Sequence, residues 1–130
     1  MANQDDVRRI AMALPGALEV AGRFAFAVPN KGKEKAFAWV WMERLDPKKA
    51  RVPQPAVLAV RVANEEAKQF LVGAMPDSFF TEPHYNGFPA VLVRLAAVQH
   101  DTLESLILDA WRTQAPKELL AELDARAAAP

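Results

Sequence analysis

The chain contains no cysteine and only five glycines among its 130 residues. Without cysteine there can be no disulfide, no thiolate metal site and no cysteine nucleophile. The glycines form no phosphate-cradling motif, and no apolar run approaches the roughly 18 residues of a membrane span. The first six residues are acidic and lack the basic and apolar regions of a signal peptide. We therefore expect a cytoplasmic protein without a membrane segment.

Side chains for acid–base or metal chemistry are also sparse. There are two histidines; no carboxylate or second histidine lies at ligand spacing from His84-Tyr85, and His100 is sixteen residues away. Ser78 and Ser105 lack the surroundings of a nucleophile elbow. The sequence therefore predicts no catalytic residue, no metal and no cofactor, and we expect a protein that is not an enzyme. His84 and Tyr85 are expected to form a packed or hydrogen-bonded pair.

Positive and negative charges balance at sixteen each, but they are unevenly placed along the chain. Residues 30–53 carry seven basic side chains against three acidic ones, and residues 101–130 carry three against six. A partner that recognises positive charge would meet the middle of the chain first. The zero net charge predicts little long-range steering of nucleic acid. Length and ordinary composition fit a single domain over residues 1–130.

Four segments show the apolar spacing of helices, each after a residue that favours a helix start. The starting residues are Asn3, Asn64, His100 or Asp101, and Pro116. The first helix is expected to end at Pro15-Gly16, and the third to turn Trp111 inward. Strands are predicted over residues 23–28, 35–42, 56–62 and 90–95, and residues 43–55, with three prolines, are predicted to be a loop.

The resulting order is α-β-β-β-α-β-α-α. Because adjacent hairpin strands are separated in sequence from most of the helices, it indicates an α+β fold. We expect an antiparallel four-stranded sheet with the helices packed on one face.

Alternation along the strands assigns side chains to the two faces of this sheet. The face under the helices is expected to hold Phe24, Phe26, Phe37, Trp39, Trp41, Leu58, Val60, Val91 and Val93. The opposite face is expected to show Arg23, Ala25, Ala27, Ala36, Ala38, Ala59, Arg61, Leu92 and Arg94. Its three arginines could bind a planar or phosphorylated ligand. Alternatively, they belong to an ordinary solvated face, where arginine stems cover small apolar atoms.

Two loops next to the predicted hairpin are basic. Their charged residues are Lys31, Lys33 and Lys35 in the first loop, and Lys48, Lys49 and Arg51 in the second. Paired basic loops beside a sheet can contact phosphates without reading base sequence, as a wing-type nucleic-acid binder does. Both loops could equally be ordinary solvated turns.

Several fragments, taken in their order and spacing, resemble one protein family. These fragments are Leu14-Pro15-Gly16, Glu19, Phe24, His84-Tyr85-Asn86-Gly87-Phe88-Pro89, Val91–Leu95, Ala110-Trp111-Arg112 and Ala115-Pro116-Lys117. Together they resemble the MmcQ/YjbR family, small bacterial α+β proteins related in fold to the CyaY (frataxin-like) group. The resemblance covers nearly the whole chain. It implies a YjbR/CyaY-like fold.

The resemblance further implies a non-enzymatic module that binds DNA weakly through phosphate contacts of two basic wings. The candidate DNA-binding residues are Lys31, Lys33, Lys35, Lys48, Lys49, Arg51, Arg61 and Arg94. An adaptor that binds a protein or a small anionic metabolite through the arginine face is the alternative. Iron binding, which frataxin-like proteins perform with an acidic ridge on the first helix, is not expected, because Asp5-Asp6 is followed by Arg8-Arg9.

Overall fold

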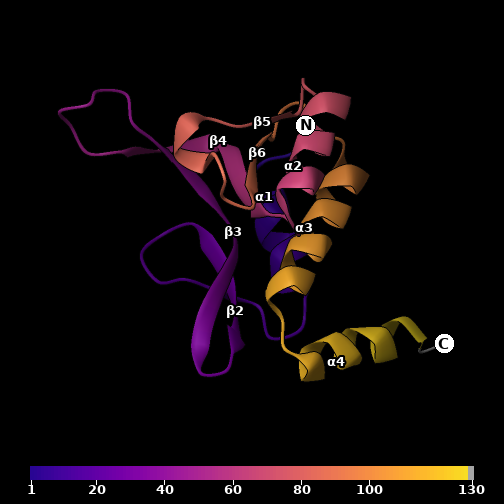
Figure 1. Ribbon diagram of the computed structural model, residues 1–130. Coiled ribbons are helices and arrows are strands. Elements are labelled where there is room, and N and C mark those ends of the chain that lie inside the picture. Colours follow the sequence, from indigo (N-terminus) through magenta and orange to yellow (C-terminus); the bar gives the residue numbers. More distant parts are fainter. Residues whose placement is uncertain (129–130) are drawn as a thin grey trace.

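The computed structural model describes residues 1–128, which form one six-stranded antiparallel sheet covered by helices (Figure 1). The helices are α1 (Gln4–Met12), α2 (Glu65–Ala74), the 3-10 helix η1 (Pro83–Tyr85), α3 (His100–Gln114) and α4 (Lys117–Ala128). The strands are β1 (Leu18–Glu19), β2 (Ala25–Asn30), β3 (Lys33–Glu43), β4 (Val52–Arg61), β5 (Phe79–Phe80) and β6 (Ala90–Arg94). Their order in the sheet is β1-β2-β3-β4-β6-β5.

The predicted α+β class and antiparallel sheet are confirmed, whereas the predicted number of strands was too small. The two edge strands β1 and β5 have two residues each, which is too short for any alternation to be visible in the sequence. Strand β4 also begins earlier than predicted, at Val52, and pairs Pro53 with Met42 of β3. Proline is tolerated there because β6 pairs only with Val57–Arg61, which leaves this part of β4 at an edge.

Two helix starts have the side-chain caps that the sequence predicts. The Asn3 side chain accepts a hydrogen bond from the Asp6 backbone N–H at 3.0 Å, and the Asp6 carboxylate accepts one from the Asn3 N–H at 3.0 Å. This reciprocal pair is a capping box. Asn64 accepts from the Ala67 N–H at 2.8 Å. Both asparagines therefore satisfy backbone donors that a helix end leaves open.

A bulge in β3 changes which side chains lie under the helices. Phe26 of β2 pairs with Ala38, whereas Ala27 pairs with Ala36, so Phe37 is the additional residue between the two pairs. One inserted residue moves the following side chains to the other face of the sheet. Phe37 is fully buried in the core under the helices.

Three predicted side-chain positions are consequently wrong. Trp39 and Trp41 lie on the face opposite the helices, and Ala38 lies on the helix face. The remaining residues assigned to the helix face do belong to the core there; they are Phe24, Phe26, Phe37, Leu58, Val60, Val91 and Val93. The error has one physical cause, because alternation alone cannot reveal an extra residue within a strand.

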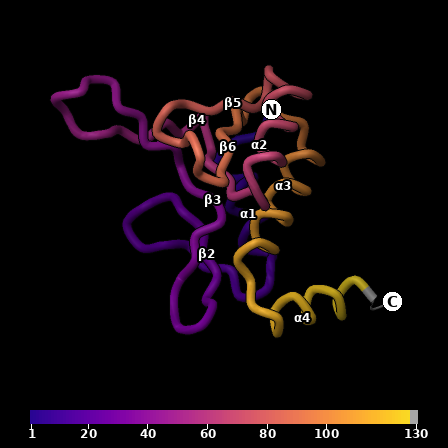
Figure 2. Tube along the Cα trace, viewed as in Figure 1, coloured from indigo at the N-terminus to yellow at the C-terminus, as the bar shows by residue number. Residues whose placement is uncertain are grey.

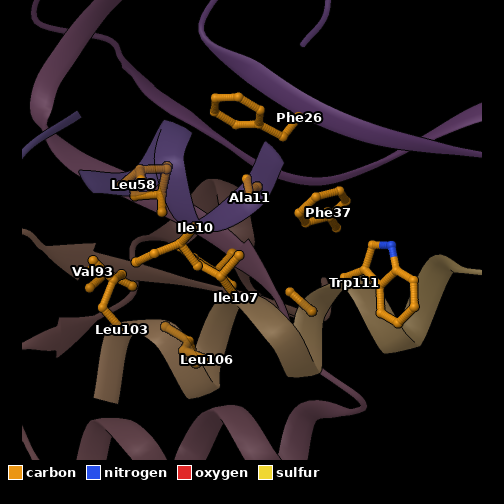
Figure 3. Packing of buried hydrophobic residues seen from close by; sticks show 14 of the residues in the cluster. Ile10, Ala11, Phe26, Phe37, Leu58, Val93, Leu103, Leu106, Ile107 and Trp111 are labelled. Carbon is orange, nitrogen blue, oxygen red and sulfur yellow. The ribbon is translucent and has the colours of Figure 1, made fainter. Parts of the chain in front are cut away.

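The main core fills the space between the sheet and helices α1 and α3. Trp111, predicted to point inward, is fully buried, and its indole Nε1–H donates to the Pro15 carbonyl oxygen at 3.0 Å. This bond joins α3 to the end of the first helical region. Figure 3 shows the side chains that meet here, among them Ile10, Ala11, Phe26, Phe37, Leu103, Leu106, Ile107 and Trp111. Helix α4 runs outward from the end of α3 (Figure 2).

No helix within residues 1–128 has the length and apolar character needed to cross a membrane.

We expect Trp111→Phe to lower the free energy of unfolding by about 2–4 kcal/mol, because it leaves a cavity and an unpaired Pro15 carbonyl. Trp41→Phe is the matched control, since the Trp41 indole N–H has no hydrogen-bond partner within residues 1–128. Urea unfolding followed by circular dichroism measures both. Equal losses for the two variants would contradict the assigned role of the Trp111 hydrogen bond.

Candidate functional site

The sheet face opposite the helices carries a second apolar cluster, which we call the aromatic face. It consists of Trp39, Trp41, Phe80, Tyr85 and Phe88, from β3, β5, η1 and the turn before β6. Ring centroids lie 5.6 Å apart for Trp41 and Phe80, 6.1 Å for Tyr85 and Phe88, and 6.4 Å for Trp39 and Phe88, all at steep angles. Such edge-to-face contacts stabilise beyond simple burial. The aromatic face is therefore a packed layer.

A buried lysine fixes the chain segment that covers this face. Lys68 of α2 is 0% exposed. Its Nζ donates to the carbonyl oxygens of Tyr85 at 2.7 Å and Phe88 at 2.8 Å, and lies 3.2 Å from the Glu65 carboxylate. A buried charge is tolerated only when it is paired and hydrogen-bonded, and three acceptors match the three ammonium donors. Lys68 thus holds the 85–88 turn against α2.

Two arginines lie over rings of the aromatic face. The guanidinium carbon of Arg94 lies 4.2 Å from the Phe80 ring centroid, and that of Arg61 lies 5.0 Å from the Phe88 centroid. Arg94 also donates to the backbone carbonyl of Pro76 at 3.1 Å. Cation–π contact restrains the planar group over its ring, and only the N–H donors that are neither buried nor bonded to the protein's own carbonyls could bind an anion. Both residues were predicted to lie on this face, and the structure places them there.

The Tyr85 hydroxyl is the polar centre of the aromatic face. It accepts a hydrogen bond from the Trp39 indole Nε1–H at 3.2 Å. Burial raises the pKa of the Tyr85 hydroxyl; the Trp39 hydrogen bond and the charges of Arg51 and Arg23 oppose this, and Glu82 adds to it.

The His84–Tyr85 pair is a packing contact in this structure. The two rings, both in η1, meet edge-on with centroids 5.5 Å apart. Within residues 1–128, no three or more histidine, aspartate or glutamate side chains are grouped so that they could hold a metal ion.

The two basic loops lie at opposite ends of β3, and they do not emerge side by side as expected. The first is the turn between β2 and β3, and the second connects β3 with β4 over residues 44–51. Figure 1 shows them projecting in different directions. Because β3 has eleven residues, its ends are roughly 30 Å apart.

The first loop presents its lysines toward the helix side of the hairpin. Lys33 pairs with Asn30, whose side chain donates to the Gln114 carbonyl at 2.8 Å, and Lys35 pairs with the core residue Val28. Cross-strand partners share one face of a sheet. Lys33 and Lys35 are thus separated from Arg61 and Arg94, and the eight predicted residues do not form one surface.

The second loop is braced by its own side chains. Arg44 donates to the carbonyl oxygen of Lys49 at 2.9 Å, and Asp46 accepts from the Lys48 N–H at 2.9 Å. Arg51 donates to the Met42 carbonyl at 3.0 Å, which anchors the loop to β3. The side chains of Lys48 and Lys49 are exposed and make no ion pair within residues 1–128. The loop therefore displays two free positive charges.

Sequence reasoning missed Lys68, although the chain contains a signal for it. Lys68 precedes Leu71, Val72 and Met75 at intervals of three, four and seven residues, which is the spacing of one helix face. All three are packed against the main core. A lysine in the inward stripe of a helix indicates a buried ammonium group with designated acceptors.

Comparisons with known proteins give relatives in sequence and in fold. No family model matches the chain. The uncharacterized proteins Mb2600 of Mycobacterium bovis and MT2646 and Rv2570 of Mycobacterium tuberculosis are each 38% identical over 128 residues, covering 92% of this chain and 94% of theirs. The crystal structure of Deinococcus radiodurans protein DR2400, a DUF419 domain, matches with a TM-score of 0.68 and 24% identity over 95% of this chain and 89% of that one. DUF419 is the MmcQ/YjbR-like family. At this identity the likeness to DR2400 shows the fold alone.

We expect the Tyr85 hydroxyl to titrate above its ordinary pKa of 10.0 in the folded protein, because burial disfavours the phenolate. The chain has a single tyrosine, so the absorbance of tyrosinate reports this residue alone, and the urea-unfolded protein is the control. The unfolded state releases this proton first, so stability should fall as pH rises through 10.0, the ordinary value. A folded-state midpoint at or below the unfolded one would contradict the buried placement.

We expect Lys68→Met to cost about 1–3 kcal/mol of unfolding free energy, because two buried carbonyl oxygens lose their donor. Hydrogen exchange in residues 83–89 should accelerate in the same variant. Gln69→Met, at the exposed neighbouring position, is the matched control and should change stability by less than about 0.5 kcal/mol. Unchanged exchange in Lys68→Met would exclude the assigned anchoring role.

Proposed function

We propose a function for the basic surface of this chain, which belongs to the same protein family as mycobacterial Rv2570, MT2646 and Mb2600. The protein is a cytoplasmic, non-enzymatic DNA-binding module of the MmcQ/YjbR type, which contacts phosphates. The DUF419 fold of DR2400 supports the type. The observation that supports DNA binding is a strip of basic residues that follows β4.

The strip begins at the 44–51 loop and ends at Arg61. The loop precedes β4, Arg94 lies opposite Val57 in the middle of β4, and Arg61 is the last residue of β4. Lysine side chains supply mobile positive charge at one end, and arginines restrained on aromatic rings supply oriented donors further along. Contacts of both kinds go to phosphate oxygens and carry no base preference.

The length of the strip favours a polymeric anion. Strand β4 has ten residues and spans roughly 30 Å, which equals about nine base pairs of duplex DNA at 3.4 Å each. A small anionic metabolite could reach the arginines or the loop, but not both. The zero net charge of the chain is consistent with weak binding that depends on local contacts.

The candidate residues are expected to contribute unequally to DNA binding, because only some of them belong to the strip. Lys48, Lys49, Arg61 and Arg94 are its principal contacts, with Arg51 holding the loop in place. Lys33 and Lys35 face the helix side of the hairpin, so we assign them a minor contribution, and Lys31 lies in the turn beyond the strip.

The test is fluorescence anisotropy of a labelled duplex of about 20 base pairs, titrated at several salt concentrations. We expect affinity to fall steeply with salt, and Lys48→Ala/Lys49→Ala to make the logarithmic salt slope about 2 units shallower, one per lost phosphate contact. Lys33→Ala/Lys35→Ala removes the same charge from the helix side and should change the slope far less. Arg9→Ala/Arg126→Ala, two exposed arginines on helices, controls for net charge.

Equal effects of all three double variants would contradict the strip, and the absence of salt-dependent binding would contradict the function. Loss of binding on Arg61→Ala/Arg94→Ala with no response to the loop lysines would instead indicate a small anionic ligand on the arginine face. Single-stranded DNA and RNA of the same length complete the comparison.

A further inference from the structure

A groove of about 680 Å³ lies between α2 and α3, next to the end of β4. These helices run beside the sheet in Figure 1. The lining is mostly apolar and includes Ala67 and Leu71 of α2 and Leu106 of α3. Phe70 stands at this groove with 70% of its surface exposed. An exposed phenylalanine beside an apolar groove is a feature that protein interfaces use.

Four charged side chains line the groove. Arg61, at the end of β4, lies over the Phe88 ring, whereas the other three make no ion pair within residues 1–128. Glu66 lies one helical turn before Phe70, while Asp109 and Arg112 come from α3. Within the same residues, none of these three makes a side-chain hydrogen bond. Acidic and basic side chains thus flank the same apolar floor, and each of the three remains free to meet an opposite charge from outside.

We propose that this groove is the interface of a two-fold symmetric homodimer. Phe70 of each copy enters the groove of the other, and Glu66 of each copy faces Arg112 of the partner subunit. In a two-fold interface the same patch occurs on both sides, so a patch that carries an aromatic knob, an apolar groove and both charges is complementary to itself. Every favourable contact is then made twice.

Charge complementarity selects a second copy over other occupants. A purely acidic partner would place like charges against Glu66 and Asp109. A purely basic partner would place like charges against Arg112. A small ligand in the groove would leave Phe70 exposed at the rim. The groove lies between α2 and α3 and reaches Arg61 at the end of β4, so a dimer would approach this one residue of the basic strip, whereas the 44–51 loop and Arg94 do not line the groove. The dimer proposal does not depend on the DNA-binding proposal.

Sedimentation velocity over a wide range of protein concentration tests the dimer. We expect the wild-type chain to show a concentration-dependent monomer–dimer equilibrium. Phe70→Glu should weaken it by at least about tenfold, because two apolar insertions are lost. Since Phe70 is exposed, this variant should keep the wild-type unfolding midpoint at protein concentrations where the wild type is monomeric, which circular dichroism verifies.

A charge exchange tests the orientation of the two copies. Glu66→Arg and Arg112→Glu should each weaken the dimer by like-charge contacts, whereas the double variant Glu66→Arg/Arg112→Glu should restore it. Glu118→Arg, an exposed charge reversal on α4, is the matched control and should leave the equilibrium unchanged. A wild-type monomer at every concentration overturns the proposal, as does a double variant no better associated than the single ones.

Discussion

The bulge at Phe37 determines the arrangement of the whole sheet. By inserting one residue opposite the Phe26–Ala27 step, it keeps Phe37 in the main core and turns Trp39 and Trp41 to the opposite face. The sheet therefore has two apolar faces, and each needs a cover. Helices α1 and α3 cover one. The segment from β5 to β6 covers the other, with Phe80, Tyr85 and Phe88 packed around the two tryptophans.

The segment from β5 to β6 is a small cover, and the ammonium group of Lys68 holds it in place. Lys68 lies among apolar residues of α2 and uses its ammonium group to bind the carbonyl oxygens of Tyr85 and Phe88. An apolar side chain at this position would leave both carbonyls without a donor in a buried site. The same segment supplies Phe88 as the platform for Arg61, while Phe80 supports Arg94. The anchoring of the cover and the orientation of the arginines are thus one structural feature.

The two proposed functions, phosphate binding and dimerisation, use different sides of the sheet. Arg61 and Arg94 of the basic strip lie on the aromatic face, and we propose that phosphates bind there and at the 44–51 loop. The groove between α2 and α3, where we propose that two copies associate, lies on the helix side and borders the strip only at Arg61. A neutral chain can in this way bind an anion on one side without repelling its own copy on the other, because the groove carries charges of both signs.

Local signals in the sequence determined the elements of this protein. The caps at Asn3 and Asn64, the inward Trp111 and the antiparallel α+β class depend on neighbouring residues and on period, and the structure confirms them. Only the tertiary structure decided the faces of Trp39 and Trp41, the two edge strands, the partners of Lys68 and the distance between the basic loops. Each of these depends on residues that are far apart in sequence: a bulge is defined by its partner strand, and a buried ammonium by the carbonyls that reach it. Spacing along one strand cannot specify either.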